Sequence, residues 1–140
     1  MKRIIDVALC CQGEILLCLE AVAHFPGELY WIPPGGKPKP GEDDVTAIYR
    51  EVEEELGITL AMFAERGIIL KPYCEHRGDW HGDKITIQHF IAELDEPLPF
   101  KLLVGQRDAR WASVSPAGGS ISTFTEVLMI NLRLGGYLHQ

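Results

Sequence analysis

Hydrophobic residues gather in short runs along the first part of this chain. Residues 4–11 and 14–19 are mostly apolar, and the dipeptide Gln12-Gly13 separates them. Two apolar runs joined by a two-residue turn that contains glycine predict a β-hairpin. Three later apolar runs predict further strands, over residues 60–71, 84–94 and 110–114.

Two other segments repeat their hydrophobic residues at the period of a helix. These segments are residues 43–56 and 124–134, and a glycine directly follows each of them. Glycine just after the last periodic residue is typical of a helix C-terminus. Thr123, with Glu126 three residues later, predicts a capping box at the start of the second helix.

The remaining segments near the N-terminus are expected to be loops. Residues 21–29 contain proline and glycine, and residues 33–41 hold four prolines and three glycines, which remove backbone donors and conformational constraint. No repeat or linker-like tract interrupts the chain, so residues 1–140 are expected to form a single domain. Strands and helices in this order indicate an α/β fold, with a mixed central sheet and helices on its faces.

The composition is that of an ordinary soluble chain, with 46% hydrophobic and 24% charged residues. It excludes a disordered tail and a fibrous repeat. The apolar runs are far shorter than the ~20 residues of a membrane span, and no signal-peptide pattern is present. The four cysteines form no C-x-x-C pair, which favours reduced, buried thiols and a cytoplasmic location over a disulfide framework.

The negative charge is concentrated in one segment. The chain has 20 acidic and 13 basic residues, and residues 42–55 alone hold seven acids against one base, Arg50. Because the rest is almost neutral, a surface for nucleic-acid polymers is not expected. The segment is either a solvated helix face or a cation site.

The expected helix places three of these carboxylates on one side. At 100° per residue, Glu51, Glu54 and Glu55 share an arc of about 100° beside the apolar stripe, whereas Glu53 lies on the back. Arg50 lies four residues before Glu54, the spacing of a helical ion pair. Like charges repel at this spacing, and hard cations such as Mg²⁺ prefer oxygen ligands. A bare E-x-x-E-E is nevertheless more often a solvated face, so the flanking residues decide.

The flanking residues complete a longer pattern. Gly36 is followed after five residues by Glu42 and, after seven more, by the run Arg50-Glu51-Val52-Glu53-Glu54-Glu55-Leu56-Gly57-Ile58. At every fixed position this segment of 23 residues resembles the signature of the Nudix hydrolases, G-x5-E-x7-R-E-U-x-E-E-x-G-U, in which U is aliphatic. An aromatic residue followed by Pro-Gly-Gly before the segment fits the same family.

The resemblance implies a Nudix-type α/β/α sandwich with a loop-helix-loop metal site. The implied ligands of Mg²⁺ or Mn²⁺ are one backbone carbonyl and three carboxylates: Gly36, Glu51, Glu54 and Glu55. Arg50 and Glu42 are implied to orient the glutamates, and Arg50, Glu51 and Glu54 to take part in catalysis. Bound metal neutralises the acidic segment, bridges pyrophosphate oxygens and lowers the pKa of water.

Further candidates lie outside the fixed positions of the signature. Lys37 and Lys39 are candidate phosphate-binding residues, with solubilising loop lysines as the alternative. Asp108 is a candidate for the extra carboxylate that many family members use as ligand or general base; the alternatives are a plain turn aspartate, and Glu51 as the base. The polar segment at residues 76–83 and Asn131 are candidates to border or read a base.

The family hydrolyses a nucleoside diphosphate linked to another group, X. The short chain and residues 31–37 resemble the small nucleoside-triphosphate pyrophosphohydrolases, which implies that a (deoxy)nucleoside triphosphate yields a monophosphate and pyrophosphate. ADP-ribose or a dinucleoside polyphosphate is an alternative substrate, and a non-catalytic nucleotide-binding module is an alternative class; the intact glutamates favour an enzyme. The expected partner is a small nucleotide, without a nucleic-acid polymer or a membrane. The oligomeric state stays open, a homodimer included.

Overall fold

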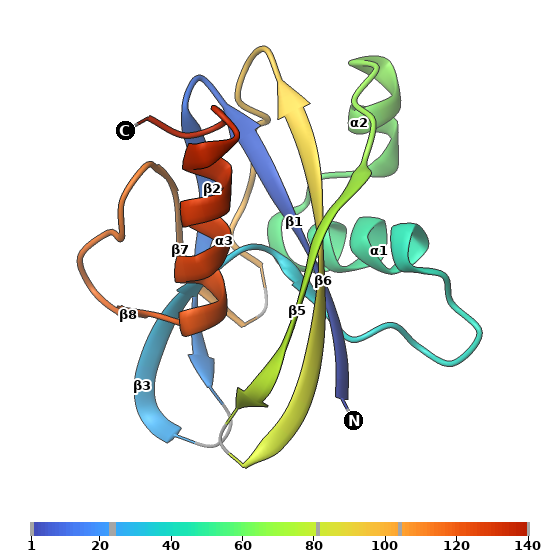
Figure 1. Cartoon of the computed structure of the whole chain (residues 1–140). Coiled ribbons are helices and arrows are strands. Elements are labelled where there is room, and N and C mark those ends of the chain that lie inside the picture. Colours follow the sequence, from blue (N-terminus) through green and yellow to red (C-terminus); the bar gives the residue numbers. More distant parts are fainter. Residues whose placement is uncertain (1, 23–24, 81, 104, 140) are drawn as a thin grey trace.

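A curled mixed sheet carries helices on both faces (Figure 1). The computed structural model describes residues 2–22, 25–80, 82–103 and 105–139. The strands are β1 (Lys2–Cys11), β2 (Glu14–Val22), β3 (Phe25–Ile32), β4 (Gly35–Gly36), β5 (Lys71–Trp80), β6 (Asp83–Leu94), β7 (Gln106–Ala112) and β8 (Ser120–Ile121). The helices are α1 (Asp44–Leu56), α2 (Leu60–Glu65) and α3 (Thr123–Leu134).

The strands follow the order β5-β6-β1-β2-β3-β8, with β4 paired to β1 and β7 paired to β2. Strands β1 and β6 are parallel, and β1 and β2 are antiparallel. The predicted hairpin between β1 and β2 is confirmed. Its turn residues Gln12 and Gly13 have φ of 52° and 81°, the left-handed values of a two-residue hairpin turn.

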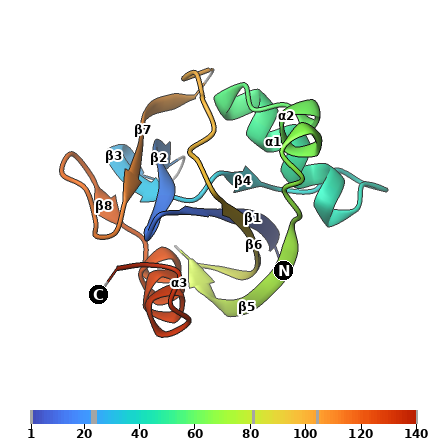
Figure 2. The ribbon, with the colours of Figure 1, turned by 90° about the horizontal axis from the view of Figure 1, so that it is seen from above.

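Two hydrophobic cores lie on opposite faces of this sheet. Along β1, Ile5, Val7 and Leu9 pack in the core that contains the buried face of α1, whereas Ala8 and Cys10 pack in the core with α3. Successive side chains of a strand point to opposite faces, so one apolar strand serves both cores. Viewed from above, α1 and α2 lie on one side of the curled sheet and α3 on the other (Figure 2).

Both predicted helices are present, and the first has the expected ends. Asp43 caps α1, because its side chain accepts a hydrogen bond from the Thr46 backbone N–H at 2.8 Å. Gly57 ends α1 with φ 65°, a left-handed conformation that costs other residues more than glycine. No helix in the described part of the chain is long and apolar enough to cross a membrane.

Residues 60–71 do not form the predicted strand. Leu60–Glu65 is the helix α2, capped by Thr59, and β5 begins only at Lys71. Phe63 is the buried residue of this helix, and Met62, Ile68 and Leu70 pack partly buried against the same core. The apolar run therefore reflects a short helix and the segment after it rather than a half-buried strand. Strand β5 was not predicted beyond Lys71, because its sequence from Glu75 to Asp79 is polar and its order is imposed by pairing with β6.

The two predicted loops also contain strand. Strand β2 continues to Val22 and β3 begins at Phe25, with a register irregularity between Ala21 and Val22. Within the proline-rich segment, Gly35 and Gly36 pair with Asp6 and Ile5 of β1. In both places, contacts with neighbouring strands override the local preference of proline and glycine.

The cap of α3 is Ser122 rather than the predicted Thr123. The Ser122 side chain accepts a hydrogen bond from the Thr125 backbone N–H at 3.1 Å and donates one to the Thr125 hydroxyl at 2.8 Å. Thr123 is exposed and already helical, so the capping box with Glu126 does not form.

This cap gives a test of the helix start. We expect Ser122→Ala to lower the free energy of unfolding by about 1 kcal/mol, because the Thr125 N–H loses its acceptor. Thr123→Ala, one residue later, is the matched control and is expected to change it by less than about 0.5 kcal/mol. Urea denaturation of both variants measures the difference. Equal losses would show that Ser122 is not the cap.

Candidate active site

Helix α1 presents three glutamates at graded depths. Glu55 is buried, the Glu51 side chain is 16% exposed and that of Glu54 is 56% exposed. Glu53 is exposed and belongs to the other side of the helix. The three carboxylates thus form a series from the core boundary to solvent, as expected for an arc that borders the apolar stripe of the helix.

Arg50 connects this series to the loop before the helix. Its guanidinium donates to both carboxylate oxygens of Glu42, at 2.8 and 2.9 Å, and to Glu51 at 2.9 Å. Weaker contacts reach Glu54 at 3.3 Å and the Lys37 carbonyl at 3.1 Å. A planar guanidinium that pairs bidentately restrains the orientation of its partners. Arg50 therefore holds Glu42, Glu51 and the loop in one arrangement, as the resemblance implies.

Glu42 is fixed from two sides. The hydrogen bonds from Arg50, together with one from the Lys39 backbone N–H at 3.0 Å, lower the pKa of Glu42 to about 2. The carboxylate is consequently charged across the physiological range. Glu42 serves as the anchor for Arg50 rather than as a further open carboxylate.

The loop approaches the helix too closely for any side chain. A Cβ at Gly36 would lie 2.6 Å from the Glu51 carboxylate, and a Cβ at Gly35 would lie 2.2 Å from the Ile5 carbonyl oxygen. Both glycines pair with β1 at the same time. The Gly-Gly pair is therefore required by contact on two sides, which brings the loop backbone against Glu51.

Glu55 is the most perturbed acid of the site. Burial, followed by the charges of Glu20 and Glu51, raises the pKa of Glu55 to about 9, against a hydrogen bond from the Gly35 backbone. Its Oε2 atom is buried without a hydrogen-bond partner among the described residues. A buried oxygen without a partner is costly, so this position is suited to a cation.

Glu20 of β2 is a member of this cluster that sequence reasoning missed. Burial raises its pKa, a hydrogen bond from Gln106 lowers it, and the charge of Glu51 raises it. The signal was present: Glu20 follows Leu16 and Cys18 on the core-facing side of β2, where a charged residue needs a reason to be buried. Gln106 begins β7 beside it, and its side chain donates to Glu20.

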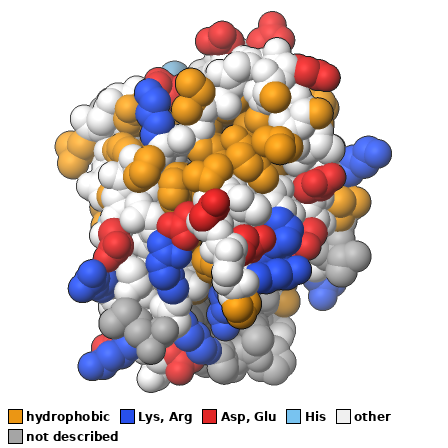
Figure 3. Space-filling model, turned by 90° about the vertical axis from the view of Figure 1, so that its right-hand side faces the viewer, with side chains coloured by type: hydrophobic (Ala, Val, Ile, Leu, Met, Phe, Trp, Pro, Cys, Tyr) orange, Lys and Arg blue, Asp and Glu red, His pale blue; other side chains and the backbone are white. Residues whose placement is uncertain are grey.

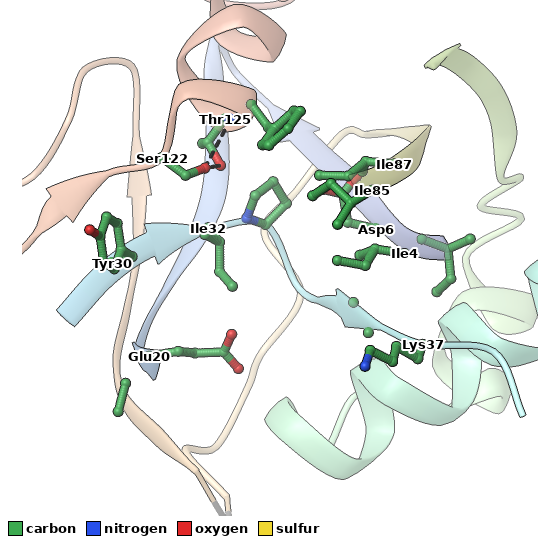
Figure 4. A pocket seen from close by; sticks show the side chains of 16 residues that line it. Ile4, Asp6, Glu20, Tyr30, Ile32, Lys37, Ile85, Ile87, Ser122 and Thr125 are labelled. Atoms are coloured by element: carbon green, nitrogen blue, oxygen red, sulfur yellow. Dashed lines mark hydrogen bonds between the residues drawn. The ribbon is translucent and has the colours of Figure 1, made fainter. Parts of the chain in front are cut away.

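A cavity of about 300 Å³ opens beside the cluster, between the two halves of the sheet. Strands β1 and β2 pair only near their shared turn, at Cys10 and Cys11, so they diverge towards the other end. Glu20 and Lys37 lie at the end of the cavity nearest α1, and Ser122 and Thr125, at the start of α3, lie at the other end (Figure 4). Apolar walls with a few polar groups are typical of a small-molecule site. The apolar lining is Ile4, Ile5, Ala21, Ile32, Pro33, Ile85, Ile87 and Phe124.

The remaining candidates, Lys37, Lys39 and Asp108, lie at different distances from the cavity and the glutamates. Lys37 lines the cavity, whereas Lys39 is exposed and contributes only its backbone N–H to Glu42. Asp108 accepts hydrogen bonds from its neighbours Ala109 and Arg110. It pairs in register with Leu19, which packs on the α3 side of the sheet. The structure therefore does not bring Asp108 to the glutamates of α1.

None of the described side chains among the candidate base-binding residues lines the cavity. Of residues 76–83, those described belong to β5, β6 and their turn rather than to a loop, and His81 is outside the described residues. Asn131 lies on α3, where its carbonyl accepts a hydrogen bond from the Tyr73 hydroxyl at 3.0 Å. The face that carries α1 shows acidic and basic side chains intermixed below a group of hydrophobic ones (Figure 3).

Comparison with known proteins identifies the class. The family described as "NUDIX domain" matches residues 2–117. The fold resembles the MutT protein from Methanosarcina mazei Go1, with a TM-score of 0.72 and 18% identity over 96% of this chain and 94% of that one. It also resembles the E. coli dihydroneopterin triphosphate pyrophosphohydrolase, with a TM-score of 0.71 and 18% identity over 95% of both chains.

A shorter match concerns sequence alone. The mRNA-decapping protein g5R of African swine fever virus is 49% identical over 48 residues, which are 34% of this chain and 20% of the viral protein. The chain thus spans about a fifth of the length of the curated relative. The family match covers most of the chain, and the chain belongs to the Nudix hydrolase family.

Proposed function

We propose that this protein is a divalent-metal-dependent pyrophosphohydrolase that converts a (deoxy)nucleoside triphosphate into a monophosphate and pyrophosphate. The observation that carries the proposal is that one wall of the cavity lies against the glutamates of α1. Glu20, Gly35, Gly36 and Lys37 line the cavity, and Glu51 and Glu55 lie directly behind that loop. A nucleotide in the cavity therefore has its phosphates beside the carboxylates.

The residues present fit a hard divalent cation. The Nudix family generally uses divalent metals. Among the described residues the Glu55 Oε2 atom has no hydrogen-bond partner, and burial, followed by the charges of Glu20 and Glu51, raises the pKa of Glu55. Mg²⁺ and Mn²⁺ take such oxygen ligands. The proposed ligands are the Gly36 carbonyl and three glutamates of the signature, Glu51, Glu54 and Glu55. Glu20, rather than Asp108, is the additional carboxylate that the geometry favours.

Side chains of this protein position the metal-binding glutamates and neutralise the charge of the phosphates. Arg50 holds Glu51 and Glu54 in place through its contacts at 2.9 and 3.3 Å, and Glu51 is the candidate general base. Lys37, at the cavity end nearest α1, is placed to meet a phosphate. When bound, the cation polarises the pyrophosphate oxygens and promotes ionisation of water. Hydrolysis of this kind needs mainly positioning and charge stabilisation.

The cavity favours a nucleoside over a bare polyphosphate. Its largely apolar walls suit the flat face of a base, and the buried Asp6 together with Ser122 and Thr125 provides polar groups at its edges. The fold neighbour from E. coli acts on a triphosphate, as its name states. The single cavity at this wall supports a triphosphate with one base more directly than a substrate with two nucleosides.

Product analysis tests the proposal. We expect turnover with Mg²⁺ to give a nucleoside monophosphate and pyrophosphate, with monophosphates inert, because the site is built around a diphosphate linkage. Chromatography of the products measures this, with canonical nucleotides, ADP-ribose and a dinucleoside tetraphosphate in the panel. Preference for either of the last two would overturn the triphosphate choice. Orthophosphate and a nucleoside diphosphate as sole products would contradict the proposed reaction itself.

Two neighbouring glutamates provide a matched pair for the ligand assignment. We expect Glu54→Gln to lower kcat by at least ~10²-fold while the fold stays intact, because an anionic ligand is lost at the reacting centre. Glu53→Gln is equally exposed, on the other side of α1, and is expected to stay within about twofold of the wild type, since such a surface change is usually tolerated. Steady-state kinetics and circular dichroism measure both. Equal losses in the two variants would refute the assignment.

A further inference from the structure

A second group of metal-ligating side chains lies on the other face of the sheet. Cys74 and His76 belong to β5 and His89 to β6, and one ligand atom from each lies within 4.8 Å of the other two. Cys74 pairs in register with His89, and residues two apart on a strand share a face. Cys74 packs against the core on the α3 side, so the group is separated by the sheet from the glutamates of α1.

His89 is already oriented as metal-binding histidines are. Its ring is fully buried; Nδ1 contacts the Asp6 carboxylate at 2.5 Å, and Nε2 contacts Nδ1 of His76 at 2.9 Å. When Nδ1–H donates to the carboxylate, Nε2 keeps its lone pair and directs it at His76. A carboxylate behind a histidine is the usual arrangement around zinc.

We propose that Cys74, His76 and His89 bind Zn²⁺ or a similar transition-metal ion. One sulfur and two ring nitrogens are the donors that such metals prefer, whereas the glutamates of α1 suit Mg²⁺. In a tetrahedral zinc site two ring nitrogens stand about 3.3 Å apart. Because those of His76 and His89 are 2.9 Å apart, a small ring displacement makes room. Three protein ligands leave a fourth position for water.

A metal ion can reach this site from solvent, and each proton that binding displaces has a destination. Strand β5 is the first in the strand order, and Cys74 and His76 are half-buried, so an ion enters from solvent at that edge. Burial raises the pKa of Cys74 to about 11, so the free thiol is protonated at neutral pH. Binding forms a metal–sulfur bond and releases that proton to solvent. His76 changes tautomer: its proton moves from Nδ1 to Nε2, which frees Nδ1 to bind the metal and leaves the ring neutral.

Cobalt uptake tests the site independently of any hydrolytic activity. Reduced full-length protein, held in excess Mg²⁺ to occupy the carboxylates, is titrated with Co²⁺ as a spectroscopic substitute for Zn²⁺. We expect one equivalent to bind with a thiolate-to-cobalt charge-transfer band, and equimolar Zn²⁺ to remove that band. Cys74→Ser is expected to abolish the band. His76→Ala, a change at a half-buried position, is expected to weaken cobalt binding at least tenfold.

Two controls separate this site from others. His139→Ala, which changes an exposed histidine, and Glu54→Gln, which changes the carboxylate cluster, are both expected to leave the charge-transfer band unaltered. Absence of the band in the wild type would overturn the proposal and leave the three residues as a hydrogen-bonded chain from Asp6. A band that persists in both Cys74→Ser and His76→Ala would overturn it equally.

Discussion

The carboxylate of Glu55 is buried against Glu20 and Glu51, and one of its oxygens has no hydrogen-bond partner in the part of the chain that the structure describes. Two negative neighbours and little water make the charged form unfavourable unless a cation is present. The surrounding structure holds the three carboxylates close together and does not relieve their repulsion. The glycine loop lies against Glu51 with no room for a side chain, and Arg50 divides its hydrogen bonds among Glu42, Glu51 and Glu54.

The divergence of β1 and β2 places a cavity beside the buried carboxylates. Because the two strands pair only near their turn, the short strand β4 fits against β1 further along, and a cavity opens between the halves of the sheet. Gly35 and Gly36 thus form part of the cavity wall while they contact β1 and α1. The same loop therefore borders both the cavity and the glutamates of α1.

The signature and its helix were predictable because their determinants are local. The cap at Asp43, the left-handed Gly57 and the arc of glutamates follow from spacing along one helix. Glu20 is marked locally only as a charged residue on the core-facing side of β2. Gln106 reaches it through strand pairing between β2 and β7, which no local pattern records. Strand β5 was missed for the same reason: a polar edge strand such as residues 75–79 is ordered by its neighbour β6.

The proposed metal site depends most on Glu55, whose buried position favours a bound cation. Thermal melting of the wild type and Glu55→Gln, each with and without saturating Mg²⁺, tests it most directly. Binding to the native state alone raises stability as RT ln(1 + [L]/Kd), about 2.7 kcal/mol at a hundredfold excess over Kd. We expect Mg²⁺ to raise the melting temperature of the wild type by several degrees and that of the variant far less. Equal shifts in the two proteins, or none in the wild type although it binds Mg²⁺, would contradict it.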